Sequence, residues 1–209
     1  MRNKLNKQKR KSEIQETSRT MLIVCEGEKT EPNYFKGFLR DLENSKIRVK
    51  IIGEGYNTVS LVKRTIELRG DEANYCRVWV VFDRDSFKPQ DFNKAMQLAK
   101  NENIDVAYSN QAFELWYLLH FHYYDTARDR DSYKKMLSIL LNREYQKNGK
   151  DMYAELKDRQ EAAIRNARKL LERYNPPAPE KDNPSTTVHL LVKELNVYRK
   201  DKWTDRGLG

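Results

Sequence analysis

Two uninterrupted apolar runs constrain the fold of this 209-residue chain more than any other feature. The first run is Met21–Cys25 and the second is Val78–Phe82, and neither alternates between apolar and polar residues. Strands of this kind are covered on both faces, which is typical of parallel sheets in α/β proteins. We therefore predict that both runs are strands of one parallel sheet.

Helical and strand patterns alternate along the chain as far as Asn110. The predicted helices cover 32–42, 58–68 and 90–100, and the further strands cover 47–52, 77–82 and 104–108. This alternation implies right-handed crossovers between parallel strands, so the expected α/β core is a parallel sheet sandwiched by helices. Beyond Asn110 only helical patterns follow, at 113–124, 132–141, 151–174 and 185–198.

Acidic residues follow both apolar runs directly. Glu26 comes after the first run, and Asp83 and Asp85 come after the second. Parallel strands present their carboxyl ends at one sheet edge, so these side chains should lie on the same edge. Carboxylates and water are the ligands that Mg²⁺ prefers, which indicates metal-assisted chemistry on phosphates. The alternatives are that Glu26 caps the next helix and that the aspartates form a turn.

Four segments of the chain resemble the RloB family. They are Cys25–Phe35 (CEGEKTEPNYF), Phe82–Asp85 (FDRD), Ser109–Trp116 (SNQAFELW) continuing to His120–Phe121, and Asn183–Val188 (NPSTTV). The resemblance implies a Toprim-like fold in which Glu26, Asp83 and Asp85 bind Mg²⁺, with Mn²⁺ as a substitute, and act in catalysis. It also implies a nuclease that works in abortive-infection defence against phage, controlled by an ATPase partner.

Three segments are expected from these patterns. Residues 1–20 form a basic arm without apolar periodicity, which is expected to be disordered and either solvated or in contact with nucleic acid. Residues 21–125 form the Toprim-like α/β core, and 126–209 form an all-helical C-terminal extension packed on that core.

Further site residues have both a functional and a structural interpretation. Glu114, at the start of an apolar helix, is a candidate catalytic acid or a helix-dipole partner, and Glu31 is a candidate additional acid with the same alternative. Ser185, Thr186 and Thr187 are candidates for phosphate binding, because hydroxyls at a helix start suit an anion, although capping alone would explain Ser185.

The net charge of +9 favours a polyanionic partner, RNA or DNA. A nucleic-acid-binding or sensor subunit with a degenerate acidic site is the alternative to the nuclease. Cys25 and Cys76 are expected to be reduced core thiols, and no stretch is long enough to span a membrane. These features predict a cytoplasmic protein with no membrane partner.

Overall fold

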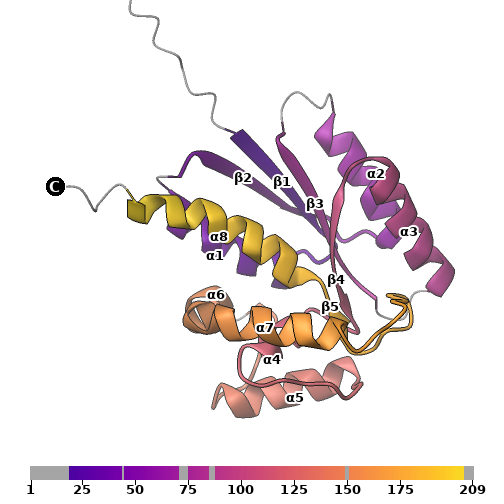
Figure 1. The fold of residues 1–209 in the computed structure, drawn as a ribbon, viewed down its shortest axis with the longest axis vertical. Coiled ribbons are helices and arrows are strands. Elements are labelled where there is room, and N and C mark those ends of the chain that lie inside the picture. Colours follow the sequence, from indigo (N-terminus) through magenta and orange to yellow (C-terminus); the bar gives the residue numbers. More distant parts are fainter. Residues whose placement is uncertain (1–18, 44, 71–74, 85–87, 149–150, 205–209) are drawn as a thin grey trace, which may run out of the picture.

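The computed structural model describes residues 19–43, 45–70, 75–84, 88–148 and 151–204. Five strands form one sheet in the order β2-β1-β3-β4-β5, in which β5 runs antiparallel to β4 and the other pairs are parallel. The strands are β1 (Arg19–Cys25), β2 (Ile47–Gly53), β3 (Arg77–Asp83), β4 (Asp105–Asn110) and β5 (Ser185–Thr186). The predicted α/β class with a mainly parallel sheet is confirmed (Figure 1).

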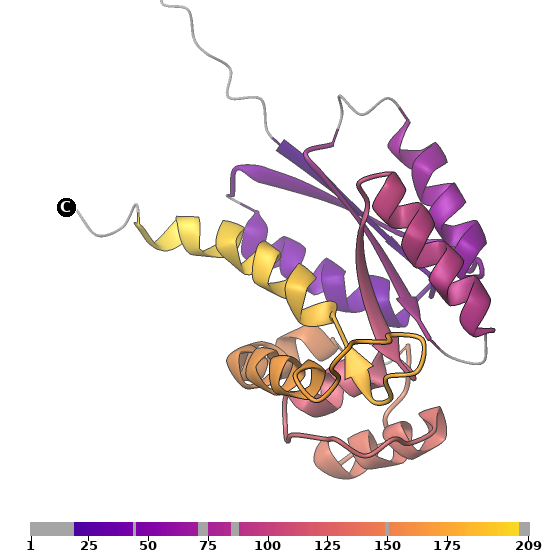
Figure 2. The same ribbon diagram turned by 45° about the vertical axis from the view of Figure 1, so that its right-hand side comes forward.

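Helices cover both faces of the sheet (Figures 1 and 2). One face carries α2 (Thr58–Arg69) and α3 (Pro89–Asn101), and the other carries α1 (Thr30–Leu42) and α8 (Val188–Thr204). The remaining helices are α4 (Glu114–Leu119), α5 (Arg130–Leu140), α6 (Met152–Leu156) and α7 (Gln160–Leu171), with a 3₁₀ turn at Lys157–Arg159 between the last two. None of the helices in the described ranges is both long and apolar enough to cross a bilayer.

The two faces of β1 explain why its sequence does not alternate. Met21, Ile23 and Cys25 join the core on the α1 side, and Leu22 and Val24 join the core on the α2 side. All five side chains are fully buried. The first core also contains residues of α4 to α8, so the sheet and the C-terminal helices share one continuous hydrophobic interior.

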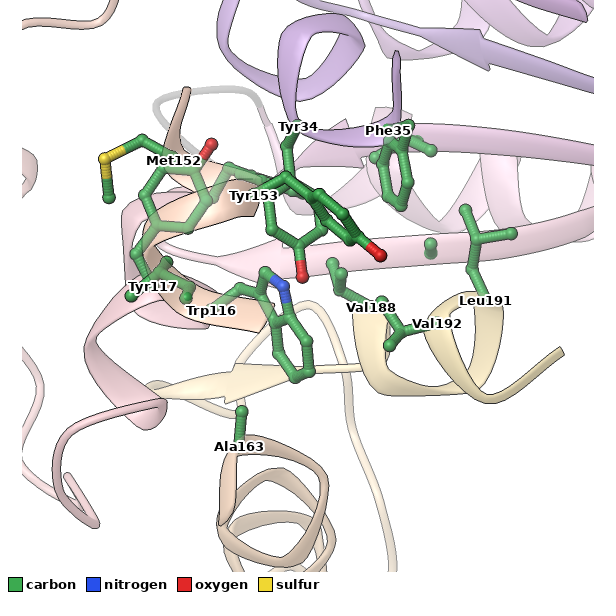
Figure 3. Packing of buried hydrophobic residues seen from close by; sticks show 14 of the residues in the cluster. Tyr34, Phe35, Trp116, Tyr117, Met152, Tyr153, Ala163, Val188, Leu191 and Val192 are labelled. Carbon is green, nitrogen blue, oxygen red and sulfur yellow. The ribbon is translucent and has the colours of Figure 1, made fainter. Parts of the chain in front are cut away.

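Tyr34 of α1 lies at the centre of this interior (Figure 3). Its ring contacts Phe113, Trp116 and Tyr153 in edge-on geometry, with centroids 5.8, 6.5 and 5.8 Å away. Edge-to-face aromatic contacts add to the stabilisation that comes from buried area. One ring therefore joins α1 to α4 and α6, which are far apart in the sequence.

Two predictions for the C-terminal region are wrong. The single helix expected at 151–174 is broken into α6, the 3₁₀ turn and α7. The region is not entirely helical either, because β5 interrupts it and α8 begins at Val188 rather than at Ser185. β5 forms because the Thr186 hydroxyl bonds the carbonyl of Tyr108 and the hydroxyl of Ser109 on β4.

Other boundaries differ less. The helix expected at 113–124 ends at Leu119, and the helices α5 to α8 share one hydrophobic core with the sheet. Cys25 is buried as expected, whereas Cys76 is exposed at the entry to β3, where the strand has not yet reached the covered part of the sheet. Residues 1–18 of the predicted arm lie outside the described residues.

Gly37 provides a test of the packing between α1 and α6. A Cβ atom at this position would overlap Cβ and Cγ of Tyr153. Gly37→Ala should therefore destabilise the protein by about 1–3 kcal/mol, although the same change at an open helix position stabilises by roughly 1 kcal/mol. Chemical denaturation of Gly37→Ala in the wild-type and Tyr153→Gly backgrounds measures this, because glycine also removes the Tyr153 Cβ atom, and an equal penalty in both would contradict the packing described here.

Candidate functional site

Glu26 and Asp83 meet at the carboxyl ends of two neighbouring strands. β1 and β3 pair in parallel with Cys25 opposite Val81, and the Glu26 N–H continues the ladder by donating to the Val81 carbonyl at 2.8 Å. The Asp83 N–H then donates to Oε2 of Glu26 at 2.9 Å. The structure therefore brings together two of the predicted site residues, while Asp85 lies outside the described residues.

Two further acids come from helix starts. Glu31 is in the first turn of α1, and Glu114 is the first residue of α4. Glu31, Asp83 and Glu114 are only 5%, 7% and 1% exposed. Glu31 and Glu114 are both close enough to Asp83 to raise its pKa. The cluster is thus one group of carboxylates drawn from two strand ends and two helices.

Burial and mutual repulsion make ionisation of this cluster unfavourable. Burial raises the pKa of Asp83 well above its usual range, and the nearby Glu31 and Glu114 raise it further, while Arg130 opposes the shift. The pKa of Glu31 is also raised, mainly by burial, while a hydrogen bond from its own backbone N–H opposes the shift and Glu114 adds to it. A cation placed among these groups would relieve the repulsion.

Basic side chains from the C-terminal half face the acids. Arg130 Nη2 donates to Oδ2 of Asp83 at 3.0 Å, and Lys147 Nζ lies 3.9 Å from Oε1 of Glu114. Tyr145 donates its hydroxyl to the same Glu114 oxygen at 3.4 Å. Arg130 is positioned by its neighbour Asp129, whose side chain accepts from the Ser132 N–H and caps α5.

Sequence reasoning missed these three residues. Arg130, Tyr145 and Lys147 lie in a region with many charged residues, and nothing in their local pattern distinguishes them. Only the folding of α5 and the following segment against the sheet edge brings them to the acids. Asp129 is a residue type that commonly caps helices, so it could indicate the start of α5. It does not indicate which residues lie opposite that start in the folded protein.

Three of these acids and both basic residues line one open cavity of about 430 Å³, and Glu114 lies beside it. Its walls are formed by Glu26, Gly27, Glu28, Lys29, Thr30, Glu31, Asp83, Arg130, Lys147 and Asn148. Gly27 leaves room for the Glu31 carboxylate, because a Cβ atom at this position would overlap that carboxylate and displace it. The cavity therefore has an acidic floor beside basic groups, a combination suited to a phosphate and a cation together.

The carboxylates fit magnesium by the chemistry of their oxygens. Among the residues that the structure describes, no group of three or more His, Cys, Asp or Glu side chains is arranged to hold a metal ion. Mg²⁺ does not need three, since it is commonly held by one or two carboxylates and keeps several waters. Glu26, whose carboxylate accepts from the Asp83 backbone N–H, and Asp83 line the same cavity and are the pair that would hold it.

The predicted phosphate-binding hydroxyls do not reach this cavity. Ser185 and Thr186 are fully buried, and Ser185 donates to the Asp182 carbonyl at 2.7 Å. Thr187 uses its hydroxyl to accept from the Tyr108 N–H and to donate to the Val106 carbonyl. Their hydroxyls hold β5 and the start of α8 against β4, and none of the three lines the cavity, so the site described here does not use them.

Comparison with known proteins identifies the family. A model of the RloB-like protein family matches residues 21–195, which include every described residue of the cavity. The chain belongs to the RloB-like protein family. No curated protein and no solved structure matches this RloB-like protein.

The acidic cluster predicts an unusual pH dependence for the RloB-like protein. Because the pKa of Asp83 is raised on folding, the folded state binds more protons than the unfolded chain between the ordinary and the raised pKa, so stability falls as pH rises through that range. Asp83→Asn removes this loss, and its amide oxygen can still accept from Arg130. Without divalent cations, the variant should unfold at a higher temperature than wild type.

This gain should grow as pH rises above about 4, the ordinary pKa of an aspartate, because the pKa of Asp83 is raised in the folded state. Each 1 kcal/mol of this gain should raise the unfolding temperature by about 2–4 °C. Differential scanning fluorimetry in EDTA measures it. Asp158→Asn, which changes an exposed carboxylate, is the matched control and should show no such trend. An Asp83→Asn protein that is less stable than wild type at every pH would show that Asp83 is a structural residue.

Proposed function

We propose that this RloB-like protein is a magnesium-dependent nuclease that hydrolyses phosphodiester bonds in RNA or DNA. The observation that carries the proposal is the contact between Glu26 and Asp83 at adjacent parallel strand ends, inside a cavity that also holds Arg130 and Lys147. Paired carboxylates suit a cation, and the basic groups suit the phosphate that the cation would also contact. The net charge of +9 favours a polyanionic substrate.

Each residue has a part in the proposed hydrolysis. Bound Mg²⁺ would supply positive charge for the phosphoryl oxygens and acidify a water molecule. Glu31 is suited to take the proton of the attacking water, because a carboxylate with a raised pKa is a better base near neutral pH. Arg130 and Lys147 would orient the phosphate, so that water oxygen adds to phosphorus while the bond to the leaving sugar oxygen breaks and that oxygen takes up a proton.

Glu114 has a supporting part in this proposal. It is nearly inaccessible to solvent, and both Tyr145 and Lys147 point to its Oε1 atom. A carboxylate held from two sides positions Lys147 at the cavity and keeps negative charge beside Asp83. The association of the family with an ATPase partner and with phage defence completes the proposal, since such a nuclease needs control until infection.

A second candidate function follows from the ion pairs. Arg130 already neutralises Asp83, and Lys147 lies beside Glu114. If these pairs persist in every state, the protein is a nucleic-acid-binding subunit of an ATPase complex with no metal chemistry of its own. Metal dependence separates the two functions.

Cleavage of labelled RNA and DNA, with and without the ATPase partner that the family resemblance implies, tests the proposal. Glu26→Gln and Asp83→Asn should each lower the magnesium-dependent rate by at least about 100-fold, because each replaces a carboxylate that would hold the metal by a neutral amide. Glu67→Gln on α2, on the opposite face of the sheet, is the matched control and should cut like wild type.

Thermal unfolding provides a second measurement that does not depend on activity. Mg²⁺ should raise the unfolding temperature of the wild type and leave that of Asp83→Asn unchanged, because a ligand that binds only the folded state stabilises it. Binding of nucleic acid without any response to Mg²⁺, together with no cleavage, would favour the second candidate.

A further inference from the structure

Four consecutive rings follow α4, and we refer to them as the aromatic strip: Phe121, His122, Tyr123 and Tyr124. His122 is exposed and the other three are half-buried, although the helix before them is completely buried. The rings of His122 and Tyr124 lie edge to face with centroids 6.1 Å apart. Phe121, Tyr123 and Tyr124 pack against the hydrophobic core, and yet each of the four rings keeps part of its surface open to solvent.

Helix α7 and the turn before it place cations on this strip. The Arg159 guanidinium lies 4.6 Å from the centroid of the Phe121 ring, and Lys169 Nζ lies 4.4 Å from that of Tyr123. Asn166 donates to the Leu119 carbonyl at 2.8 Å, which fixes α7 against the end of α4. Two of the four rings of the strip therefore each have a cation over one face, held there by the packing of α7 against α4.

The aromatic strip is connected to the cavity at both ends. Glu114, beside the cavity, and Phe121 are seven residues apart through α4, which corresponds to about 10 Å at a rise of 1.5 Å per residue. On the other side, the exposed segment 125–129 leads from the strip to Arg130 in the cavity wall. Figure 1 shows α4 between α7, which carries Lys169 of the strip, and α5, which begins with Arg130 of the cavity wall.

We infer that the aromatic strip binds a single-stranded segment of nucleic acid beside the cavity. Unpaired bases stack on aromatic rings and on guanidinium planes, whereas the bases of a duplex hide these faces in their own stack. Arg159 and Lys169 provide charge for the backbone next to those rings. That the ligand is a nucleic acid rests on the proposed function. The exposed rings of the strip narrow this class to nucleic acid with unpaired bases.

Binding of fluorescein-labelled 12-nucleotide oligomers to the full-length Asp83→Asn protein in EDTA tests this inference without cleavage. One RNA, one DNA of the same sequence and the corresponding duplexes are compared by fluorescence anisotropy. Tyr123→Leu should weaken binding of the preferred single strand by about tenfold, which is within the range for loss of one stacked base, and should change duplex binding by less than about twofold.

Tyr75→Leu is the matched control, because Tyr75 is a half-buried tyrosine just before β3, at the opposite ends of the strands from the cavity. It should leave binding unchanged. A Tyr123→Leu protein that binds single strands as tightly as its parent, or a parent that prefers duplex, would overturn the inference. The tighter of the RNA and DNA oligomers identifies the sugar that the protein prefers.

Photo-crosslinking of the protein without strip substitutions provides an independent measurement, in case Tyr123→Leu fails to fold. An oligomer that carries 5-iodouridine should form crosslinks to residues 121–124, located by mass spectrometry. Crosslinks only elsewhere would overturn the inference. If the wild-type protein forms crosslinks at the strip and cleaves no nucleic acid, the result contradicts the proposed nuclease activity but not the binding role of the strip. If it cleaves nucleic acid and forms no crosslink at the strip, the result contradicts the binding role of the strip but not the nuclease activity.

Discussion

The parallel pairing of β1 with β3 is the interaction on which the whole site depends. Their register places Cys25 opposite Val81, so that the chain leaves both strands at the same edge of the sheet. The hydrogen bond from the Asp83 N–H to Glu26 then holds the Glu26 carboxylate at the end of β3, beside Asp83. Strands buried on both faces can hold this register firmly, since a slip would move apolar side chains out of two cores at once.

The C-terminal half stabilises the acidic edge that this pairing creates. Burial of Asp83 among other carboxylates is unfavourable, and Arg130 from the first turn of α5 offsets part of that repulsion. Tyr145 and Lys147 do the same for Glu114. The helices beyond Asn110 thus complete a site whose acids come from the sheet and the helix starts, which agrees with the single hydrophobic interior that both halves share.

The sheet and the Glu26–Asp83 edge could be predicted because their signals are local. Apolar runs of five residues directly before acids define both the strands and the edge where the acids emerge. The break between α6 and α7 could not be predicted, since the buried residues Met152, Leu156, Gln160, Ala163 and Ala167 keep a helical period across the 3₁₀ turn. Arg130 and Lys147 could not be predicted either, because their positions depend on tertiary packing and not on any neighbouring residue.

Diffraction from a crystal soaked in Mn²⁺ tests the central claim most directly, because manganese takes the same oxygen ligands as magnesium and is visible by anomalous scattering. The account predicts one anomalous peak in the cavity, at about 2.0–2.2 Å from a carboxylate oxygen of Glu26 and one of Asp83, with Arg130 displaced from Asp83. An empty cavity at saturating Mn²⁺, with Arg130 still bound to Asp83, would contradict it.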